Sequence, residues 1–263
     1  MSRRSGRLAA LTLGLGLAAL VAMPVAAQDS ASVRVVHASP DAPNVDVWVD
    51  GEIVLTDVPF TAVSDYLTLP AGDYNIQVTA TGATDPVIDA DLTFEAGTSY
   101  TVAAIGPLAD ISATVLTDDR TPAEGQAKLR VFHASPSAPA SVDVAVTDGP
   151  ILVEGLAFPE ATAYLTVDPG TYPLEIRAAG EADAALTLEA TLTAGENYTA
   201  IAMDGGEAGV QVIVATEAAE IPNTAMSSGG TTLPWLVGVG FALLGAAIVA
   251  TTYTRRAAVS RAR

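Results

Sequence analysis

Apolar and polar residues alternate along most of the chain between residues 32 and 216. In the segment 45–50, valines occupy every second position and polar or aromatic side chains lie between them. The same period of two recurs in 74–79 and 88–94. Successive side chains of a β-strand point to opposite faces, so this alternation predicts strands with one buried face.

The alternating region contains an internal repeat. The motif Val-Arg-Val-Val-His-Ala-Ser-Pro at 33–40 returns as Leu-Arg-Val-Phe-His-Ala-Ser-Pro at 129–136. The offset between the copies grows from 96 to 98 residues, so two single-residue insertions keep the whole unit aligned. Two later pairs of segments also match, 66–74 with 164–172 and 96–101 with 194–199.

Each copy has the size and pattern of a β-sandwich. Turn residues such as Asp50-Gly51 and Asp85-Pro86 separate seven or eight short strands within about 90 residues, which is the size of an immunoglobulin domain. The sequence therefore predicts an all-β fold with two tandem immunoglobulin-like β-sandwich domains. They span 32–116 and 128–216 and are joined by a linker at 117–127.

The N-terminal segment predicts export. Three arginines precede an apolar run that ends at Pro24, and the small residues of Val25-Ala26-Ala27 suit cleavage after Ala27. This order is that of a signal peptide, which we assign to residues 1–27. The alternative is an uncleaved N-terminal anchor, for which the apolar run is short.

A second apolar segment predicts a membrane anchor. Residues 233–253 carry no charge, and a helix with a rise of about 1.5 Å per residue would let them cross the roughly 30 Å hydrocarbon core of a bilayer. Four arginines follow in the tail 254–263, and basic residues favour the cytoplasmic side. We therefore expect one C-terminal transmembrane helix, with the ectodomain outside and a stalk at 217–232. The alternative is a buried helix of a globular domain.

Within the stalk, the pentapeptide Ile221-Pro222-Asn223-Thr224-Ala225 resembles a sortase sorting signal. The usual signal is Leu-Pro-x-Thr-Gly before an apolar span and a basic tail, and Ile221 and Ala225 depart from it. The resemblance implies a sortase-type transpeptidase as a partner, which would attack the Thr224 carbonyl and transfer the chain to the cell wall. The alternative is an ordinary stalk before a permanent anchor.

Charge is divided between the middle of the chain and its ends. All 30 acidic residues, but only five of the 12 basic residues, lie between Asp29 and Glu220. Such an acidic region repels phosphate backbones, which argues against nucleic acid as a partner. The chain has no cysteine, so packing must hold the exported domains, as fits a prokaryotic envelope. The acidity leaves open calcium binding or adaptation to a salty habitat.

The opening motif of each repeat resembles the family known as domain of unknown function 4397. The resemblance rests on Val-Arg-Val-Val-His-Ala-Ser-Pro-Asp-Ala-Pro at 33–43, an Asp-Gly turn at 50–51, Leu-Pro-Ala-Gly at 69–72 and Tyr-Thr-Val-Ala at 100–103. It covers both repeats, although the second has a one-residue insertion after its Ser-Pro. The resemblance implies an exported prokaryotic surface module without established catalysis, and it supplies no active-site residues.

The two histidines are the candidate functional side chains. Each precedes Ala-Ser-Pro, so a possible ligand loop in each repeat contains a histidine and a serine: His37 with Ser39, and His133 with Ser135. Nucleophilic catalysis would also need an oriented third group and an oxyanion hole, and no nucleophile elbow is present. The simpler interpretation is structural, with the serine fixing a turn and the ring satisfying a loop carbonyl.

Metal and sugar sites have weaker support in the sequence. Asp41, Asp46 and Asp50 lack the spacing of a calcium loop, so we assign no metal and no cofactor. Trp48 could form a platform for a sugar, but Ala145 takes its place in the second repeat. The tyrosines recur in pairs at equivalent positions, which favours a shared structural role.

These observations predict a non-catalytic prokaryotic cell-surface protein rather than an enzyme. It would present two tandem β-sandwich modules for adhesion or envelope interaction with a surface or extracellular partner. A glycan- or divalent-cation-binding module is the alternative, and a hydrolase is a remote one. Two copies favour spacing or avidity, because tethered weak sites gain affinity through effective concentration.

Overall fold

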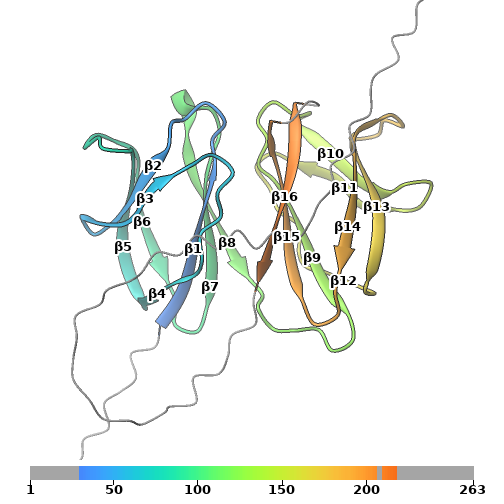
Figure 1. Cartoon of the computed structure of the whole chain (residues 1–263), viewed down its shortest axis with the longest axis horizontal. Helices are drawn as coiled ribbons and strands as arrows, with labels where there is room; N and C mark the ends of the chain where they lie inside the picture. The colour runs from blue at the N-terminus through green and yellow to red at the C-terminus, as the bar shows by residue number, and fades with distance from the viewer. Residues whose placement is uncertain (1–29, 206–208, 218–263) are drawn as a thin grey trace, which may run out of the picture.

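The computed structural model of the chain describes residues 30–205 and 209–217 (Figure 1). Residues 1–29, 206–208 and 218–263 lie outside the described residues. The first and last of these ranges contain the predicted signal peptide, the pentapeptide 221–225, the transmembrane helix, the basic tail and most of the stalk. Within the described part of the chain, no helix combines the length and apolar character needed to cross a membrane.

The described residues form sixteen strands and one short 3-10 helix, which confirms the all-β prediction. The first repeat forms β1 (Ser30–Ala38), β2 (Val45–Val49), β3 (Glu52–Val58), β4 (Leu67–Pro70), β5 (Gly72–Ala80), β6 (Pro86–Phe94), β7 (Ser99–Ile105), η1 (Leu108–Asp110) and β8 (Ser112–Asp118). The second repeat forms β9 (Ala127–His133), β10 (Ser141–Val146), β11 (Ile151–Ala157), β12 (Leu165–Val167), β13 (Gly170–Ala178), β14 (Ala184–Leu192), β15 (Asn197–Asp204) and β16 (Val210–Glu217).

Each repeat folds into two four-stranded sheets with the same strand order. In the first repeat the orders are β4-β1-β7-β8 and β3-β2-β5-β6, and in the second they are β12-β9-β15-β16 and β11-β10-β13-β14. We call these units the first and second sandwich. β1 runs parallel to β7, and β9 runs parallel to β15. The two-layer architecture is as predicted, whereas the strand order differs from the ABED and CFG sheets of an immunoglobulin constant domain.

The strands continue slightly beyond the predicted domain limits. β8 ends at Asp118, two residues inside the segment 117–127 that was predicted as a linker. β16 ends at Glu217, the first residue of the predicted stalk. The physical reason is that both carboxylates are buried in contacts with the other repeat, so these two strand ends are held in place by tertiary structure.

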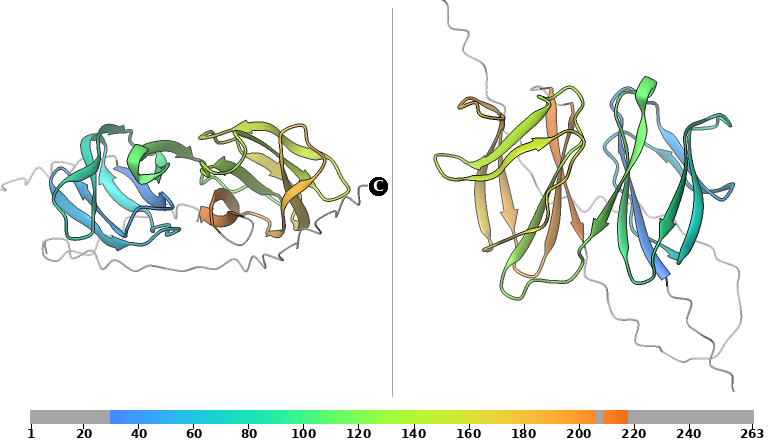
Figure 2. Two further views of the ribbon diagram at one scale, coloured as in Figure 1. Left: turned by 90° about the horizontal axis from the view of Figure 1, so that it is seen from above. Right: turned by 180° about the vertical axis from the view of Figure 1, so that it is seen from behind.

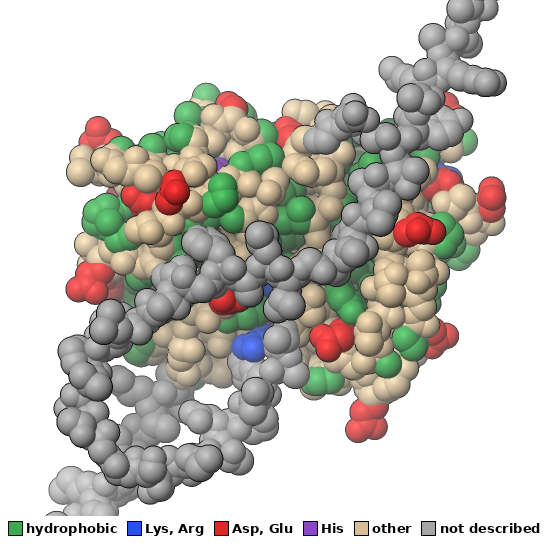
Figure 3. Space-filling view, viewed as in Figure 1, with side chains coloured by type: hydrophobic (Ala, Val, Ile, Leu, Met, Phe, Trp, Pro, Cys, Tyr) green, Lys and Arg blue, Asp and Glu red, His purple; other side chains and the backbone are tan. Residues whose placement is uncertain are grey.

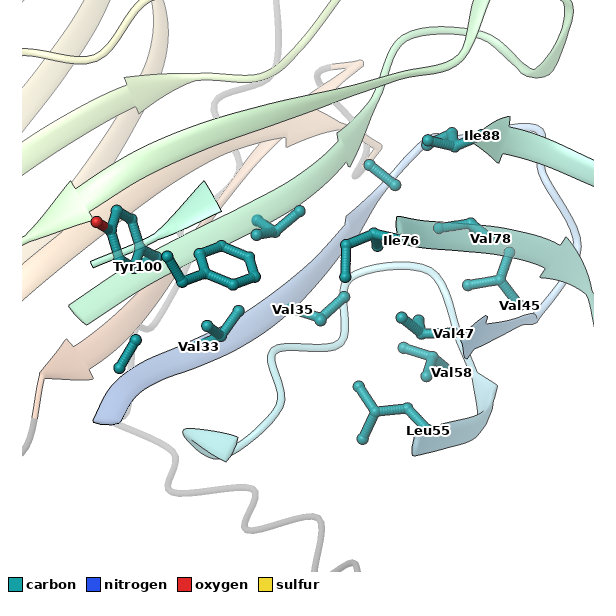
Figure 4. Close-up of a cluster of buried hydrophobic side chains, with 14 residues drawn as sticks. Val33, Val35, Val45, Val47, Leu55, Val58, Ile76, Val78, Ile88 and Tyr100 are labelled. Atoms are coloured by element: carbon teal, nitrogen blue, oxygen red, sulfur yellow. The ribbon is translucent and has the colours of Figure 1, made fainter. Parts of the chain in front are cut away.

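The alternating residues supply the interior of each sandwich. In the first sandwich, one continuous group of buried side chains fills the space between the sheets, including Val33, Val47, Ile76, Phe94 and Tyr100 (Figure 4). In the second sandwich the buried side chains separate into two groups, one around Val144 and Ile176 and the other around Leu129 and Tyr198. The interior is therefore continuous in one repeat and divided in the other.

The two sandwiches pack against each other through their inner sheets (Figure 1 and Figure 2). β1 and β7 of one repeat and β9 and β15 of the other are buried on both faces. Their second faces meet in a group of buried apolar residues that we call the interface cluster. Its members are Val36, Ala38, Ala103, Ile105, Phe132, Ala134, Ile201 and Met203. The molecule thus has four layers, with the inner two sheets in contact.

Candidate functional site

The four residues of the predicted ligand loops are buried at strand ends. His37 lies near the end of β1 and His133 ends β9, and both are fully inaccessible, as are Ser39 and Ser135. Each histidine ring contacts the carbonyl oxygen of the last proline of its motif. The distances are 3.1 Å from His37 Nε2 to Pro43 O and 3.0 Å from His133 Nε2 to Pro139 O. A ligand from solvent therefore has no direct access to either ring.

Both ring nitrogens of His37 have hydrogen-bond partners. The backbone N–H of Ser39 donates to Nδ1 at 3.4 Å, which leaves Nε2 as the donor to Pro43. Burial lowers the pKa of His37 below its ordinary value, against the opposing effect of the Pro43 hydrogen bond, so the neutral ring is favoured. The ring also meets Phe60 edge-on, with centroids 6.1 Å apart. These contacts agree with the structural interpretation of the histidine.

The serines of the two loops have different partners. The Ser135 hydroxyl donates to Asp204, and Ser137 donates to the same carboxylate from its backbone N–H at 3.2 Å and its hydroxyl at 2.7 Å. In the first repeat Gly106 takes the place of Asp204, and the Ser39 hydroxyl has no hydrogen-bond partner among the described residues. The second loop is therefore tied to β15 by a carboxylate that the first loop lacks.

An aspartate on the second strand of each repeat joins the third strand to the turn that follows the fifth strand. Asp46 accepts hydrogen bonds from the backbone N–H groups of Asp57 at 2.8 Å and Gly82 at 3.0 Å. Asp143 does the same with Gly155 at 2.7 Å and Gly180 at 2.9 Å. Burial acts to raise the pKa of Asp46, but these amides outweigh it and lower that pKa. The Gly180 and Gly155 amides lower the pKa of Asp143.

No metal centre is evident among residues 30–205 and 209–217, where no group of three or more His, Cys, Asp or Glu is placed to hold an ion. The aspartates on the second strands instead accept backbone amides. Trp48 is half-buried, and its indole N–H donates to Thr79 Oγ1 at 3.0 Å. The side chains that the sequence offered for metal or sugar binding thus have intramolecular partners.

The paired tyrosines have the same partners in both repeats, as the structural interpretation predicted. The Tyr74 and Tyr172 hydroxyls donate to the carbonyl oxygens of Pro70 and Asp168. The Tyr100 and Tyr198 hydroxyls accept from backbone N–H groups across a turn. The third pair, Tyr66 and Tyr164, takes part in the contact between the sandwiches.

Four buried charged residues join the two sandwiches in a reciprocal arrangement. Arg34 on β1 donates from Nη2 to Glu217 Oε1 on β16 at 2.8 Å. Arg130 on β9 donates from Nη2 to Asp118 Oδ1 on β8 at 2.5 Å. Each arginine therefore reaches the last residue of the other sandwich. We call Arg34, Asp118, Arg130 and Glu217 the inter-repeat lock.

Hydroxyl groups complete the lock in the same way on both sides. Asp118 accepts from Tyr66 at 2.7 Å and from Thr101 at 2.6 Å. Glu217 correspondingly accepts from Tyr164 at 2.6 Å and from Thr199, the equivalents of Tyr66 and Thr101. The arginine Nε atoms donate to the threonines, at 2.8 Å for Arg34 and 3.1 Å for Arg130. Every charge in the lock has several partners.

The lock lies in a water-poor environment. Its residues are between 1% and 7% exposed, so removal of one charged side chain would leave another buried charge uncompensated. Burial acts to lower the pKa of Arg34, but Asp118, Tyr66 and Glu217 outweigh it and raise that pKa. Burial raises the pKa of Tyr66 and of Tyr164 far above the ordinary value, so both hydroxyls stay protonated donors.

Sequence reasoning did not identify the lock. One signal was present: two of the five basic residues in the acidic region, Arg34 and Arg130, recur at the same position of an apolar strand motif. A recurrent arginine between valines indicates a buried and paired charge. Its partners could not be named, because Arg34 and Glu217 are 183 residues apart in the chain.

Two equivalent sandwiches joined by inner sheets define a tandem β-sandwich protein. A family model described as "Domain of unknown function (DUF4397)" matches residues 31–145 and 140–227. The two matches together cover most of the chain, so the chain belongs to this family, in two tandem copies. A search of curated proteins found no match to the chain.

Solved structures show remote likenesses to the chain. The TIE protein of Bacillus anthracis is 11% identical with a TM-score of 0.24; the alignment covers 66% of this chain and 34% of that one. The CBMbc domain from Eubacterium rectale, solved in complex with maltoheptaose, is 8% identical with a TM-score of 0.22; the alignment covers 70% of this chain and 96% of that one. The chain thus spans about a third of the TIE protein.

Proposed function

We propose that this protein is a non-catalytic module of the prokaryotic cell surface, which holds two sandwiches as one rigid body for adhesion or envelope interaction. The observation that carries the proposal is the inter-repeat lock together with the interface cluster. These contacts prevent the two sandwiches from moving independently about a flexible linker. A fixed spacing between two similar surfaces favours simultaneous engagement of both.

The outer surface and the buried loops support a binding role over catalysis. Acidic side chains are spread over the face shown in Figure 3, and few basic ones accompany them. Such a surface favours cationic partners and repels nucleic acid. The histidines, which are the side chains best suited to acid–base chemistry, are buried in hydrogen bonds with loop backbone.

The adhesive role can be tested on cells that display the full chain. We expect these cells to bind partner cells or coated surfaces more than cells that lack the chain, with surface amounts matched by antibody. The double variant His37→Gln/His133→Gln is the control for the loops and should keep adhesion if it reaches the surface in equal amount. Loss of adhesion in this variant at unchanged melting temperature would favour the ligand-loop alternative, and sensitivity to EDTA would favour the divalent-cation alternative.

We also propose that the chain is exported and anchored by residues 233–253, and that a sortase-type enzyme joins Thr224 to the cell wall. The sequence pattern supports this proposal, through the arginine-flanked apolar ends and the Ile221–Ala225 pentapeptide. Mass spectrometry of the mature protein tests it. A C-terminus at Thr224 is expected, and a mature chain that still contains residues 233–263 would overturn the transfer step while leaving the anchor in place.

A further inference from the structure

The second sandwich contains an apolar cavity of about 390 Å³ between its two sheets. The cavity lies between the two groups of buried side chains into which the interior of this sandwich is divided. It is partly open to solvent rather than closed. Residues that matter for its shape come from β14, β15 and β16: Leu188, Ala190, Leu192, Ala200, Val212 and Val214.

The side chains at equivalent positions explain part of the difference from the first sandwich. There, the Phe94 ring lies between Tyr100 and Tyr74, with centroid distances of 5.2 Å and 5.9 Å. In the second sandwich Leu192 takes the place of Phe94, and Ala200 takes the place of Val102. Two further exchanges act in opposite directions, because Ala190 replaces the larger Leu92 whereas Leu188 replaces the smaller Ala90. The loss of volume is therefore local, around Ala190, Leu192 and Ala200.

The edge strands follow the same trend. In the first sandwich β6 and β8 come into contact along one edge of the interior, and the contact between the equivalent strands β14 and β16 is sparser. The cavity is lined from both of these strands. An elongated group in the cavity would therefore contact both β14 and β16.

The chemistry of the lining restricts the ligand. Apart from Tyr198 and two exposed threonines, Thr191 and Thr193, the lining side chains are aliphatic. The Tyr198 hydroxyl already accepts the Thr193 backbone N–H at 3.2 Å. Residues 184–217 contain no lysine or arginine, so an anionic head group would meet no counter-charge on these strands. The volume lies within the roughly 300–1,000 Å³ typical of small-molecule sites.

We propose that the second sandwich binds one aliphatic chain of an uncharged amphiphile between its sheets, with the polar head at the solvent-exposed mouth of the cavity, beside the end of β14. Removal of the aliphatic chain from water drives binding, and an uncharged, hydroxylated head can stay in contact with solvent at the mouth. The site is independent of the adhesive role proposed above. It would give the two repeats different tasks within one rigid body.

Photolabelling of the full chain in its own membrane tests this site. The probe is a monoacylglycerol with a diazirine in its acyl chain, and labelled peptides are identified by mass spectrometry. Labels are expected on β14 and β16, in addition to any on residues 233–253. Unlabelled monoacylglycerols should compete, about fourfold more strongly for each added methylene until the cavity is full. Absence of label from the second sandwich, or equal label on β6 and β8, would overturn the proposal.

Matched variants locate the binding to the cavity. Leu192→Phe/Ala200→Val gives the second sandwich the side chains of the first and should reduce the label on β14 and β16 at least about tenfold, because the space is filled. Val102→Ala in the first sandwich reverses the Ala200→Val change at the equivalent position. It should leave the label on β14 and β16 within about twofold of the wild-type level. If the double variant does not fold, Ala190→Leu is the second filling variant. Undiminished label in a folded filling variant would overturn the proposal. Competition by dodecyl phosphate, which has an anionic head, as strong as that by a monoacylglycerol would overturn the assignment of an uncharged head.

Discussion

The two sandwiches share their strand order and their contacts at the interface, yet their interiors differ. Arg34 and Arg130 make equivalent hydrogen bonds, to Glu217 and Asp118 respectively. In contrast, Phe94 of the first interior is replaced by Leu192 in the second, where the buried side chains separate and leave a cavity.

The difference shows that buried charged positions and buried apolar positions are constrained in different ways. A buried charge tolerates little change, because its partner would be left without compensation. An apolar interior accepts exchange of one side chain for another, at a cost set by the volume that is left empty or overfilled. Two copies of one domain can therefore keep a common interface while one interior acquires a space that the other fills.

The largest effect is expected from breaking the inter-repeat lock. Arg34→Met and Arg130→Met should each lower the free energy of unfolding by about 3–5 kcal/mol, because a buried carboxylate loses the nearer of its two cations. The two losses should be similar, since the contacts are reciprocal. Equilibrium unfolding in denaturant measures both.

Arg177→Met is the matched control for the lock. It removes a cation from the more accessible pair with Glu175 and should change stability by less than about 1 kcal/mol. The double variant Arg34→Met/Glu217→Leu should cost less than the sum of its single changes, because neither charge is then left alone. A lock variant as mild as Arg177→Met would contradict the assigned role.

The next effect concerns the carboxylate that only the second loop has. Asp204→Ala removes the acceptor of Ser135 and Ser137 and should cost about 1–3 kcal/mol, because buried donors lose their partner. Asp41→Ala in the first loop removes one exposed hydrogen bond to the Leu108 N–H and should cost less. Thermal unfolding of the two variants compares them, and an equal loss would show that the loops are held alike.

Exchange of the equivalent interior residues should produce effects of opposite sign. Phe94→Leu removes the ring between two tyrosines and should destabilise the protein by about 1–1.5 kcal/mol. Leu192→Phe places a ring beside the cavity and should stabilise it by about 0.5–2 kcal/mol. Denaturant midpoints report both values. Destabilisation by Leu192→Phe would mean that the second interior has no room for the added atoms.

The smallest effect is expected from pH. Burial lowers the folded-state pKa of His37, so below the unfolded value of about 6.5 the unfolded chain binds more protons than the folded one. This contribution to stability is fully present above that pH and is lost as the pH falls toward the folded pKa. Melting temperatures of the wild type and His37→Gln should converge or cross as the pH falls from 7.5 to 5.5. Parallel curves would exclude this linkage.

Local patterns accounted for much of the fold and for part of the site. Alternation in segments such as 45–50 predicted strands, because the side-chain period of a strand is a local property. The paired tyrosines and the His-Ala-Ser-Pro turns were expected to be structural, and their hydrogen bonds agree. The carboxylates of the lock were missed, because Asp118 and Glu217 fell in segments predicted as linker and stalk.

The sequence by itself determined that the chain has two copies of one alternating, cysteine-free and acidic β-unit, since these are properties of composition and short-range order. The tertiary structure alone decided that the second faces of β1, β7, β9 and β15 cover one another, and that Arg34 finds Glu217 across the chain. It also decided that the buried side chains form one group in the first interior and two groups beside a cavity in the second. Such contacts depend on how side chains far apart in sequence share space, which no local pattern specifies.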